Sequence, residues 1–206
     1  FLDRCIQSLL NQTIDNYEII LVNDASSDSS LEIMNSYKER YPSIIKVIDS
    51  KVNQRQGGAR NLGIKSSTGE YIGFVDSDDW VKPEMFKKLF EMAKSRNLDV
   101  VGCNYIIKKG DSEKIVRQYD NYNWDEAKVE LSLSDKKNLL IEGGSVWSKI
   151  YKKKMITENN IYFPVKMAYE DNFFVPLVSY YTNSFGVVKE ALYYYFQDNT
   201  EATTKK

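Results

Sequence analysis

The sequence predicts an α/β protein with a mostly parallel sheet that carries helices on both faces. Two observations support this fold class. Helical and strand patterns alternate through residues 1–105, and such alternation is typical of parallel strands joined by crossover helices. The apolar strand patterns also end in acidic or amide side chains, as expected at the carboxyl edge of an open sheet, where ligands bind.

The first half of the chain alternates helices with strands. Residues 1–12 place apolar side chains three to four positions apart, which predicts a helix with one apolar face. Short apolar runs predict strands at residues 18–22, 44–48, 71–75 and 99–107. Polar, glycine or proline starts predict helices at residues 29–40, 57–64 and 83–95.

The second half is less regular. Residues 108–123 are typical of a loop or hairpin, and a helix is expected near residues 124–133. Another helix is expected at residues 170–181, before strands at residues 185–188 and 192–196. No repeat or linker divides the chain, so we expect one domain. Because doubly wound domains normally begin with a strand, we also expect a strand to precede the first helix.

Composition excludes several classes of function. Hydrophobic residues make up 42% of the chain, enough for a core, and the net charge of -1 argues against a nucleic-acid partner bound to a basic surface. Histidine is absent, which excludes a His general base, a Ser-His-Asp nucleophile and an HExxH zinc site. No apolar run is long enough for a membrane span, no signal peptide opens the chain, and Cys5 and Cys103 lie in apolar patterns typical of reduced core residues.

The strongest local signal is an acidic cluster, Asp76, Asp78 and Asp79, which directly follows the strand pattern at residues 71–75. A buried strand cannot hold unpaired acids, so these carboxylates must lie at its open end. They repel one another unless a cation or a donor-rich ligand neutralises them, and Mg²⁺ usually binds through one or two carboxylates plus substrate phosphates. An acidic turn that caps the next helix is the simpler alternative, but one acid would be enough for a cap.

Three further positions have both a functional and a structural interpretation. Asp24 ends the strand at residues 18–22, where it can accept hydrogen bonds from a ligand or cap the following helix. Arg60 lies at a glycine-rich helix start that lacks the usual phosphate-loop spacings, and it can face an anionic ligand or simply pack. Glu170 and Asp171 can complement the N-terminus of their helix, or supply the general base that a chain without histidine needs.

A cluster of aromatic residues surrounds Lys149 in the sequence. Trp147 and Tyr151 flank it, and three consecutive tyrosines follow at 193–195. These side chains could line a sugar-binding groove, although alternating aromatic residues more often pack in a core or on a sheet. The sequence leaves both interpretations open.

In this order, the motifs resemble the family 2 glycosyltransferases of the GT-A fold, of the bacterial polysaccharide type. The similarity is dense from Phe1 to about Tyr105 and thinner beyond it. A bare DxD pair is common, but the ordered set of motifs is specific. The matching segments are Leu9-Leu10-Asn11-Gln12-Thr13, residues 18–28, Gly58-Ala59-Arg60-Asn61-Leu62-Gly63, Asp76-Ser77-Asp78-Asp79, Trp147-Ser148-Lys149-Ile150-Tyr151 and Glu170-Asp171.

The resemblance implies a role for each residue on the donor side. Asp24 would contact the nucleobase, taken to be uracil, and Arg60 would lie beside the nucleotide. Asp76 would hold the ribose. Asp78 would bind Mn²⁺ or Mg²⁺ on the diphosphate, with Asp79 also counted among the substrate-binding residues.

On the acceptor side, the resemblance implies that Asp171 deprotonates the acceptor hydroxyl, with Glu170 beside it. Trp147 and Lys149 would flank the acceptor site. The implied reaction is an inverting, metal-dependent transfer of a sugar from a UDP-sugar donor to a hydroxyl of a saccharide or a lipid-linked saccharide.

The resemblance also implies an organisation and a setting. Residues 1–206 would form a single GT-A domain, with residues 1–105 as the nucleotide-binding half and residues 106–206 as the acceptor half. The family's usual first strand would be missing before Phe1. The implied location is the cytoplasm, extending to peripheral association with the inner face of the membrane; nucleic acid is not an expected partner, and the sequence leaves the oligomeric state open.

Two positions depart from the family pattern, and other functions compete with it. Asn23 stands where the pattern often has Asp, and Ala25 where it often has Gly. An aspartyl-nucleophile phosphatase also uses a DxD pair at a strand end, but it usually has Thr or Val two places after the second Asp, where this sequence continues through Asp79 to Trp80. A sugar-nucleotide pyrophosphorylase would want a basic Gly-rich loop near its N-terminus, and a non-catalytic carbohydrate-binding protein of the same fold would not need both acidic sites.

Overall fold

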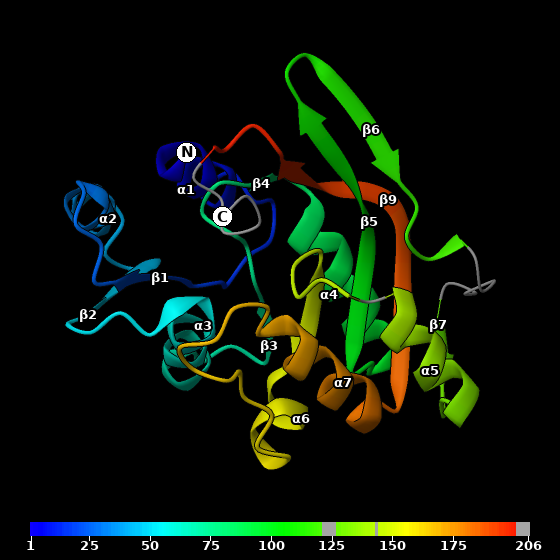
Figure 1. Cartoon of the computed structure of the whole chain (residues 1–206). Helices are drawn as coiled ribbons and strands as arrows, with labels where there is room; N and C mark the ends of the chain where they lie inside the picture. Colours follow the sequence, from blue (N-terminus) through cyan, green and yellow to red (C-terminus); the bar gives the residue numbers. More distant parts are fainter. Residues whose placement is uncertain (121–126, 143, 201–206) are drawn as a thin grey trace.

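The structure is a computed structural model of the chain, and it describes residues 1–120, 127–142 and 144–200 (Figure 1). The first half alternates helices and strands, as the sequence predicts. Its elements are α1 (Leu2–Leu10), β1 (Ile19–Asp24), α2 (Ser30–Arg40), β2 (Ile45–Ser50), α3 (Arg55–Ser66), β3 (Tyr71–Gly73), β4 (Trp80–Val81), α4 (Met85–Arg96) and β5 (Val100–Lys109).

The second half begins with a hairpin and ends in one long strand. Its elements are β6 (Ser112–Val116), β7 (Ala127–Val129), α5 (Leu133–Glu142), β8 (Lys149–Lys152), α6 (Lys153–Glu158), α7 (Asp171–Tyr181) and β9 (Ser184–Phe196). The helix expected near residues 124–133 is replaced by β7 over the part that the structure describes; residues 121–126 lie outside it. The two late strands expected from the sequence form the single strand β9.

The strands form two sheets of unequal size. Strand β1 pairs with β2 in parallel, from Ile19 opposite Ile45 to Asp24 opposite Ser50. The larger sheet has the order β3-β8-β5-β9-β4, with β6 paired to β5 and β7 paired to β9. In this sheet β5 and β9 are parallel, whereas the other pairs are antiparallel.

The larger sheet is therefore mixed, where the sequence predicted a mostly parallel one. Strand β8, from the second half of the chain, lies between β3 and β5 and runs antiparallel to both, and β4, β6 and β7 also pair antiparallel with their neighbours. Alternation of helices and strands predicts the type of each element, but it does not determine which strands become neighbours.

Helices cover both faces of the larger sheet, with α7 in front of it and α4 behind it in Figure 1. Neighbouring residues of one strand enter different cores, as the two-residue period of a strand requires. Val100 and Tyr151 pack with α7, whereas Val101 and Ile150 pack with α4. A third core joins α1 and α2 to the two-stranded sheet.

Both cysteines belong to the core, as predicted. Cys5 is 4% exposed, Cys103 is fully buried, and neither forms a disulfide. Burial raises the pKa of each thiol to about 12, which leaves them inert. Within the described part of the chain, no helix combines the length and the apolar character that crossing a bilayer requires.

The turn after β1 has an unusual backbone. Ala25 follows Asp24 with φ at 56°, in the left-handed region that glycine adopts without steric cost. This conformation explains why Gly suits the position where the family pattern often has it. The turn directs the chain from the end of β1 toward α2.

Candidate active site

Helix α3 joins the two acidic sites that the sequence singled out. The guanidinium of Arg60 donates from Nη2 to Oδ1 of Asp76 at 2.8 Å and from Nη1 to Oε1 of Glu170. Asp76 follows β3 and Glu170 directly precedes α7, so the two segments meet at one side chain. Burial alone would lower the pKa of Arg60, but the charges of Asp76 and Glu170 raise it, and the guanidinium stays charged.

Residues of α3 near Arg60 pack against the segment that leads into α7. Gly57 lies so close to this segment that an added Cβ would come within 2.2 Å of the carbonyl oxygen of Pro164. Asn61 donates from Nδ2 to the carbonyl oxygen of Phe163 at 2.8 Å and accepts the Phe163 N–H on Oδ1 at 2.9 Å. The glycine-rich helix start therefore serves close packing, and α3 positions the loop that carries Glu170.

Asp24 lies at the N-terminus of the same helix. Both of its carboxylate oxygens accept the backbone N–H of Gln54, at 2.9 and 3.0 Å. It does not cap α2, because Asp28 accepts the N–H of Ser30 there. The side chain of Asp24 is half-buried at the end of β1, and a carboxylate in this position retains lone pairs for further donors.

The three acids after β3 have different environments. Asp76 is bound to Arg60, and Asp78 is half-buried, with Oδ2 accepting the side-chain amide of Asn199 at 2.8 Å. Asp79 is 1% exposed and accepts hydrogen bonds from the Tyr193 hydroxyl at 2.6 Å and the N–H of Phe196 at 2.8 Å.

This burial changes the role of Asp79. Burial raises the pKa of its carboxyl group to about 8, against the opposing effect of its two hydrogen bonds. Its side chain faces β9, whose residues occupy both of its oxygens, and the expectation that Asp79 binds substrate stays a prediction. The two hydrogen bonds of Asp79 fix residues 76–79, which we call the acidic loop, to that strand.

Asp171, the first residue of α7, differs from its neighbour Glu170 in exposure and in hydrogen-bond partners. Glu170 is 5% exposed and paired with Arg60. Asp171 is half-buried, accepts the N–H of Asn172 at 3.1 Å and has no ion pair within the described ranges. Of the two adjacent acids, Asp171 is the one whose carboxylate can reach a ligand.

Trp147 packs behind the acidic loop. Its ring stacks on Tyr193 at a centroid distance of 4.6 Å and on Tyr195 at 5.4 Å, and its edge contacts Tyr105. Because the Tyr193 hydroxyl donates a hydrogen bond to Asp79, this aromatic stack supports the acidic loop through Tyr193. Trp147 is half-buried, so packing accounts for much of its surface.

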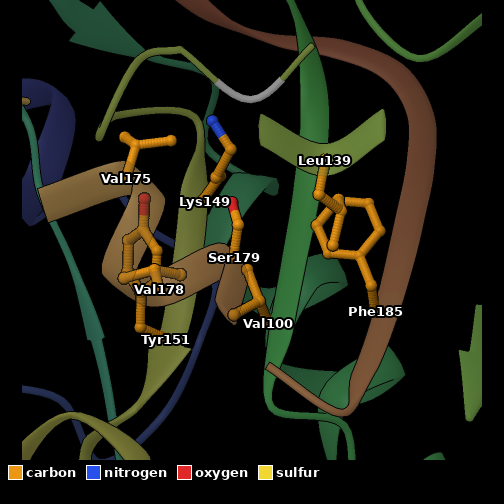
Figure 2. A pocket seen from close by; sticks show the side chains of 8 residues that line it. All are labelled: Val100, Leu139, Lys149, Tyr151, Val175, Val178, Ser179 and Phe185. Atoms are coloured by element: carbon orange, nitrogen blue, oxygen red, sulfur yellow. The ribbon is translucent and has the colours of Figure 1, made fainter. Parts of the chain in front are cut away.

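Lys149 points into the core, not toward the acids. It lines a small cavity of about 20 Å³, and its Nζ donates to the carbonyl oxygen of Ser145 at 2.6 Å. Burial lowers the pKa of Lys149 to about 7. The cavity lies between α7, α5 and the larger sheet, and Figure 2 shows its lining residues: Val100, Leu139, Lys149, Tyr151, Val175, Val178, Ser179 and Phe185. Lys149 thus lies beneath the expected acceptor side with its side chain buried, and the expectation that it flanks the acceptor site stays a prediction.

The donor set near Asp78 limits the kind of metal site. Within the described part of the chain, no group of three or more Cys, Asp or Glu side chains is arranged to hold a metal ion. Asp78 offers one carboxylate beside the Arg60-bound Asp76. This set fits an ion that shares its coordination with substrate phosphates, as Mg²⁺ commonly does, and does not fit an ion held by protein alone.

A comparison with protein-family models shows to which family the chain belongs. Residues 1–158 match the model described as Glycosyl transferase family 2. The chain belongs to this family. Its resemblance to family 2 glycosyltransferases, inferred from the ordered motifs, is thereby confirmed.

Two bacterial glycosyltransferases are among the relatives of this family-2 chain. The uncharacterized glycosyltransferase EpsJ of Bacillus subtilis is 38% identical over 79% of this chain and 47% of its own length. The poly(ribitol-phosphate) beta-glucosyltransferase of Bacillus spizizenii is 35% identical over 79% of this chain and 25% of its own length. The chain thus spans about half the length, or less, of these relatives.

Solved structures confirm the fold class. TarS 1-349 of S. aureus in complex with UDP-GlcNAc superimposes with a TM-score of 0.83 at 24% identity, covering 100% of this chain and 57% of TarS 1-349. The same protein in complex with UDP gives a TM-score of 0.79 at 26% identity, over 96% of this chain and 56% of that one. The α/β class with a GT-A fold is therefore confirmed.

Helix α3 offers a matched pair of substitutions that tests its packing. Gly57→Ala should lower the free energy of unfolding by about 1–3 kcal/mol, because the new Cβ displaces the backbone at Pro164. Gly63→Ala, in the same helix, should raise it by about 0.5–1 kcal/mol, because its Cβ meets nothing within 4 Å. Urea unfolding of both variants measures the difference, and equal effects would refute the close approach.

The lowered pKa of Lys149 predicts that the stability of the chain depends on pH. Its pKa of about 7 in the folded chain lies below the ordinary value of 10.5, so the unfolded chain binds more protons between these values. The free energy of unfolding should therefore gain up to roughly 1.4 kcal/mol per pH unit above pH 7 from this group. Lys149→Met should remove that contribution.

Urea unfolding of both proteins at pH 6, 7, 8 and 9 checks this prediction. The difference between the two curves isolates Lys149 from the other groups that titrate in this range. Curves that stay parallel from pH 7 to pH 9 would show that the amine remains charged in the folded chain.

Proposed function

We propose that this chain is the catalytic domain of an inverting glycosyltransferase. It moves a sugar from a UDP-sugar donor to a hydroxyl of a saccharide or lipid-linked saccharide acceptor. The bridge from Arg60 to Asp76 and Glu170 is the observation that carries this proposal, because it places the end of β3 beside the start of α7. Family membership and the UDP complex of TarS support the choice of donor.

On the donor side, the acids at the ends of β1 and β3 bind the nucleotide. Asp24 accepts hydrogen bonds from the uracil, and Asp76, held in place by Arg60, accepts them from the ribose. Asp78 would hold Mn²⁺ or Mg²⁺ together with the diphosphate. When bound, such an ion neutralises the negative charge that grows on the departing diphosphate.

On the acceptor side, Asp171 acts as the general base. It accepts the proton of the acceptor hydroxyl as that oxygen attacks the anomeric carbon and the bond from this carbon to the diphosphate oxygen breaks. Attack from the face opposite the leaving group inverts the configuration. Glu170 does not compete for this role, because its carboxylate is paired with Arg60.

The same proposal assigns the two halves of the chain and its setting. Residues 1–105 bind the nucleotide and residues 106–206 face the acceptor, within one domain. Trp147 and Lys149 contribute to the acceptor half through packing behind the acidic loop and beneath α7. A UDP-sugar and a lipid-linked acceptor would meet at the cytoplasmic face of a membrane, which places the domain there.

The competing functions gain no support from the site. A phosphatase would need Asp76 free to attack phosphorus, but its Oδ1 accepts a hydrogen bond from Arg60. A non-catalytic carbohydrate-binding protein would have no need of a half-buried Asp171, without an ion pair among the described residues, beside a Glu170 that is paired with Arg60.

Asp171→Asn should lower the rate of sugar transfer by at least about 100-fold, because the amide cannot accept the hydroxyl proton. The affinity for UDP should stay within about twofold, since nucleotide contacts lie at the ends of β1 and β3. UDP release from a panel of sugar nucleotides and calorimetric titration with UDP measure the two effects. Asp111→Asn, an exposed acid in the hairpin turn, serves as the control, and full activity of Asp171→Asn would reject the base assignment.

Asp78→Ala should weaken UDP binding about tenfold in the presence of Mn²⁺, a change of ~1.4 kcal/mol. Binding in EDTA should change little, because the lost carboxylate acts through the metal. Calorimetric titration under both conditions measures the difference. An unchanged affinity in Mn²⁺ would exclude Asp78 as the ligand.

A further inference from the structure

Helix α1 contacts the acidic loop with two consecutive side chains. Arg4 donates from Nη2 to the carbonyl oxygen of Asp78 at 2.8 Å. The thiol of Cys5 lies 3.5 Å from the carbonyl oxygen of Asp76 and donates to it. Adjacent residues of one helix thus bind alternate carbonyl groups of the loop.

The guanidinium of Arg4 has a fixed orientation. Its central carbon lies 3.7 Å from the ring centroid of Trp80 and 4.5 Å from that of Phe196. Trp80 in turn stacks on Tyr194 at 4.9 Å. Because a guanidinium between aromatic rings loses little freedom when it forms its hydrogen bonds, Arg4 is well suited to hold the loop in one position.

The surroundings of Arg4 are charged as well as aromatic. Burial lowers the pKa of Arg4, whereas the nearby charges of Asp79, Cys5 and Asp78 oppose that change. Its Nε is buried and has no hydrogen-bond partner among the described residues. A partly desolvated cation in this position offsets the negative charge of the Asp78 carboxylate when no ligand is bound.

The acidic loop is therefore held from two sides. Arg4 and Cys5 bind its backbone carbonyl groups, while Phe196 and Tyr193 at the end of β9 bind the side chain of Asp79. Asp78 lies between these contacts and is half-buried, with Oδ2 accepting the side-chain amide of Asn199. Its backbone is fixed before any ligand arrives.

We propose that Arg4 is a positioning residue, which fixes the backbone of Asp78 so that its carboxylate is already placed for a cation-bridged diphosphate. This inference rests on the proposed function, in which Asp78 binds the metal ion. Arg4 itself touches neither the ion nor the sugar; it acts through the carbonyl group of Asp78 and the ring of Trp80.

The test compares Arg4→Met, Arg4→Lys and Arg40→Met. Arg40 is a matched control, because it also lies over an aromatic ring, that of Tyr37 at 4.2 Å, but on α2 and away from the loop. Arg4→Met should weaken UDP binding about tenfold in Mn²⁺ and less than twofold in EDTA. Arg4→Lys keeps the charge but loses the planar stacking, so it should recover only part of the loss.

A second measurement needs no ligand. Hydrogen exchange of the amide groups at residues 76–79 should be about tenfold faster in Arg4→Lys and Arg4→Met than in the unchanged protein, and unaltered in Arg40→Met. If Arg4→Met does not fold, Arg4→Lys provides both comparisons. Exchange and Mn²⁺-dependent affinity that both match the unchanged protein would overturn the inference, as would an equal loss of affinity with and without Mn²⁺.

The two proposals fail in different ways. If the unchanged protein binds UDP equally with and without Mn²⁺, and Asp78→Ala has no effect, the proposed function fails whatever Arg4 does. If binding is Mn²⁺-dependent and sensitive to Asp78→Ala but indifferent to Arg4, the inference about Arg4 alone fails.

Discussion

The site depends on one ionic contact, the pairing of Arg60 with both Asp76 and Glu170. The Arg60 side chain is 13% exposed and that of Glu170 is 7% exposed, so neither charge could remain without the other. Removing one partner of such a buried pair typically costs about 3–5 kcal/mol, because the remaining charge is left uncompensated. The loop after β3 and the start of α7 are therefore coupled through α3, and they hold one relative position.

This contact also determines which acids remain available for chemistry. Arg60 is paired with both Asp76 and Glu170, and Asp79 is buried with its oxygens bonded to Tyr193 and Phe196. What remains is Asp78 on one segment and Asp171 on the other, each half-buried and without an ion pair among the described residues. Of the five nearby acids, two thus have no ion pair among the described residues and are not fully buried: Asp78, which is suited to a cation, and Asp171, which is suited to a proton.

The sequence predicted the elements of the first half and the acids at the strand ends, because both follow from local patterns of apolar and polar residues. It could not predict the partners of Arg60, since Glu170 lies far along the chain and is met only in the folded state. It could not predict the burial of Asp79 and Lys149 for a related reason: a charged residue in a motif gives no sign of whether its side chain faces solvent or core. The mixed sheet was missed because β8 enters from the second half.

Helix α3 shows how such positioning is encoded at the expense of the helix itself. Glycine inside a helix costs roughly 0.5–1 kcal/mol relative to alanine, and α3 contains three of them, at 57, 58 and 63. At Gly57 that cost has a structural reason, because only a residue without Cβ lets the helix lie against Pro164. Asn61, a weak helix former, uses its amide to bind the backbone of Phe163 on both sides. A helix chosen for stability would have neither residue, so their presence indicates that α3 is built to hold the loop carrying Glu170 and Asp171 against Arg60.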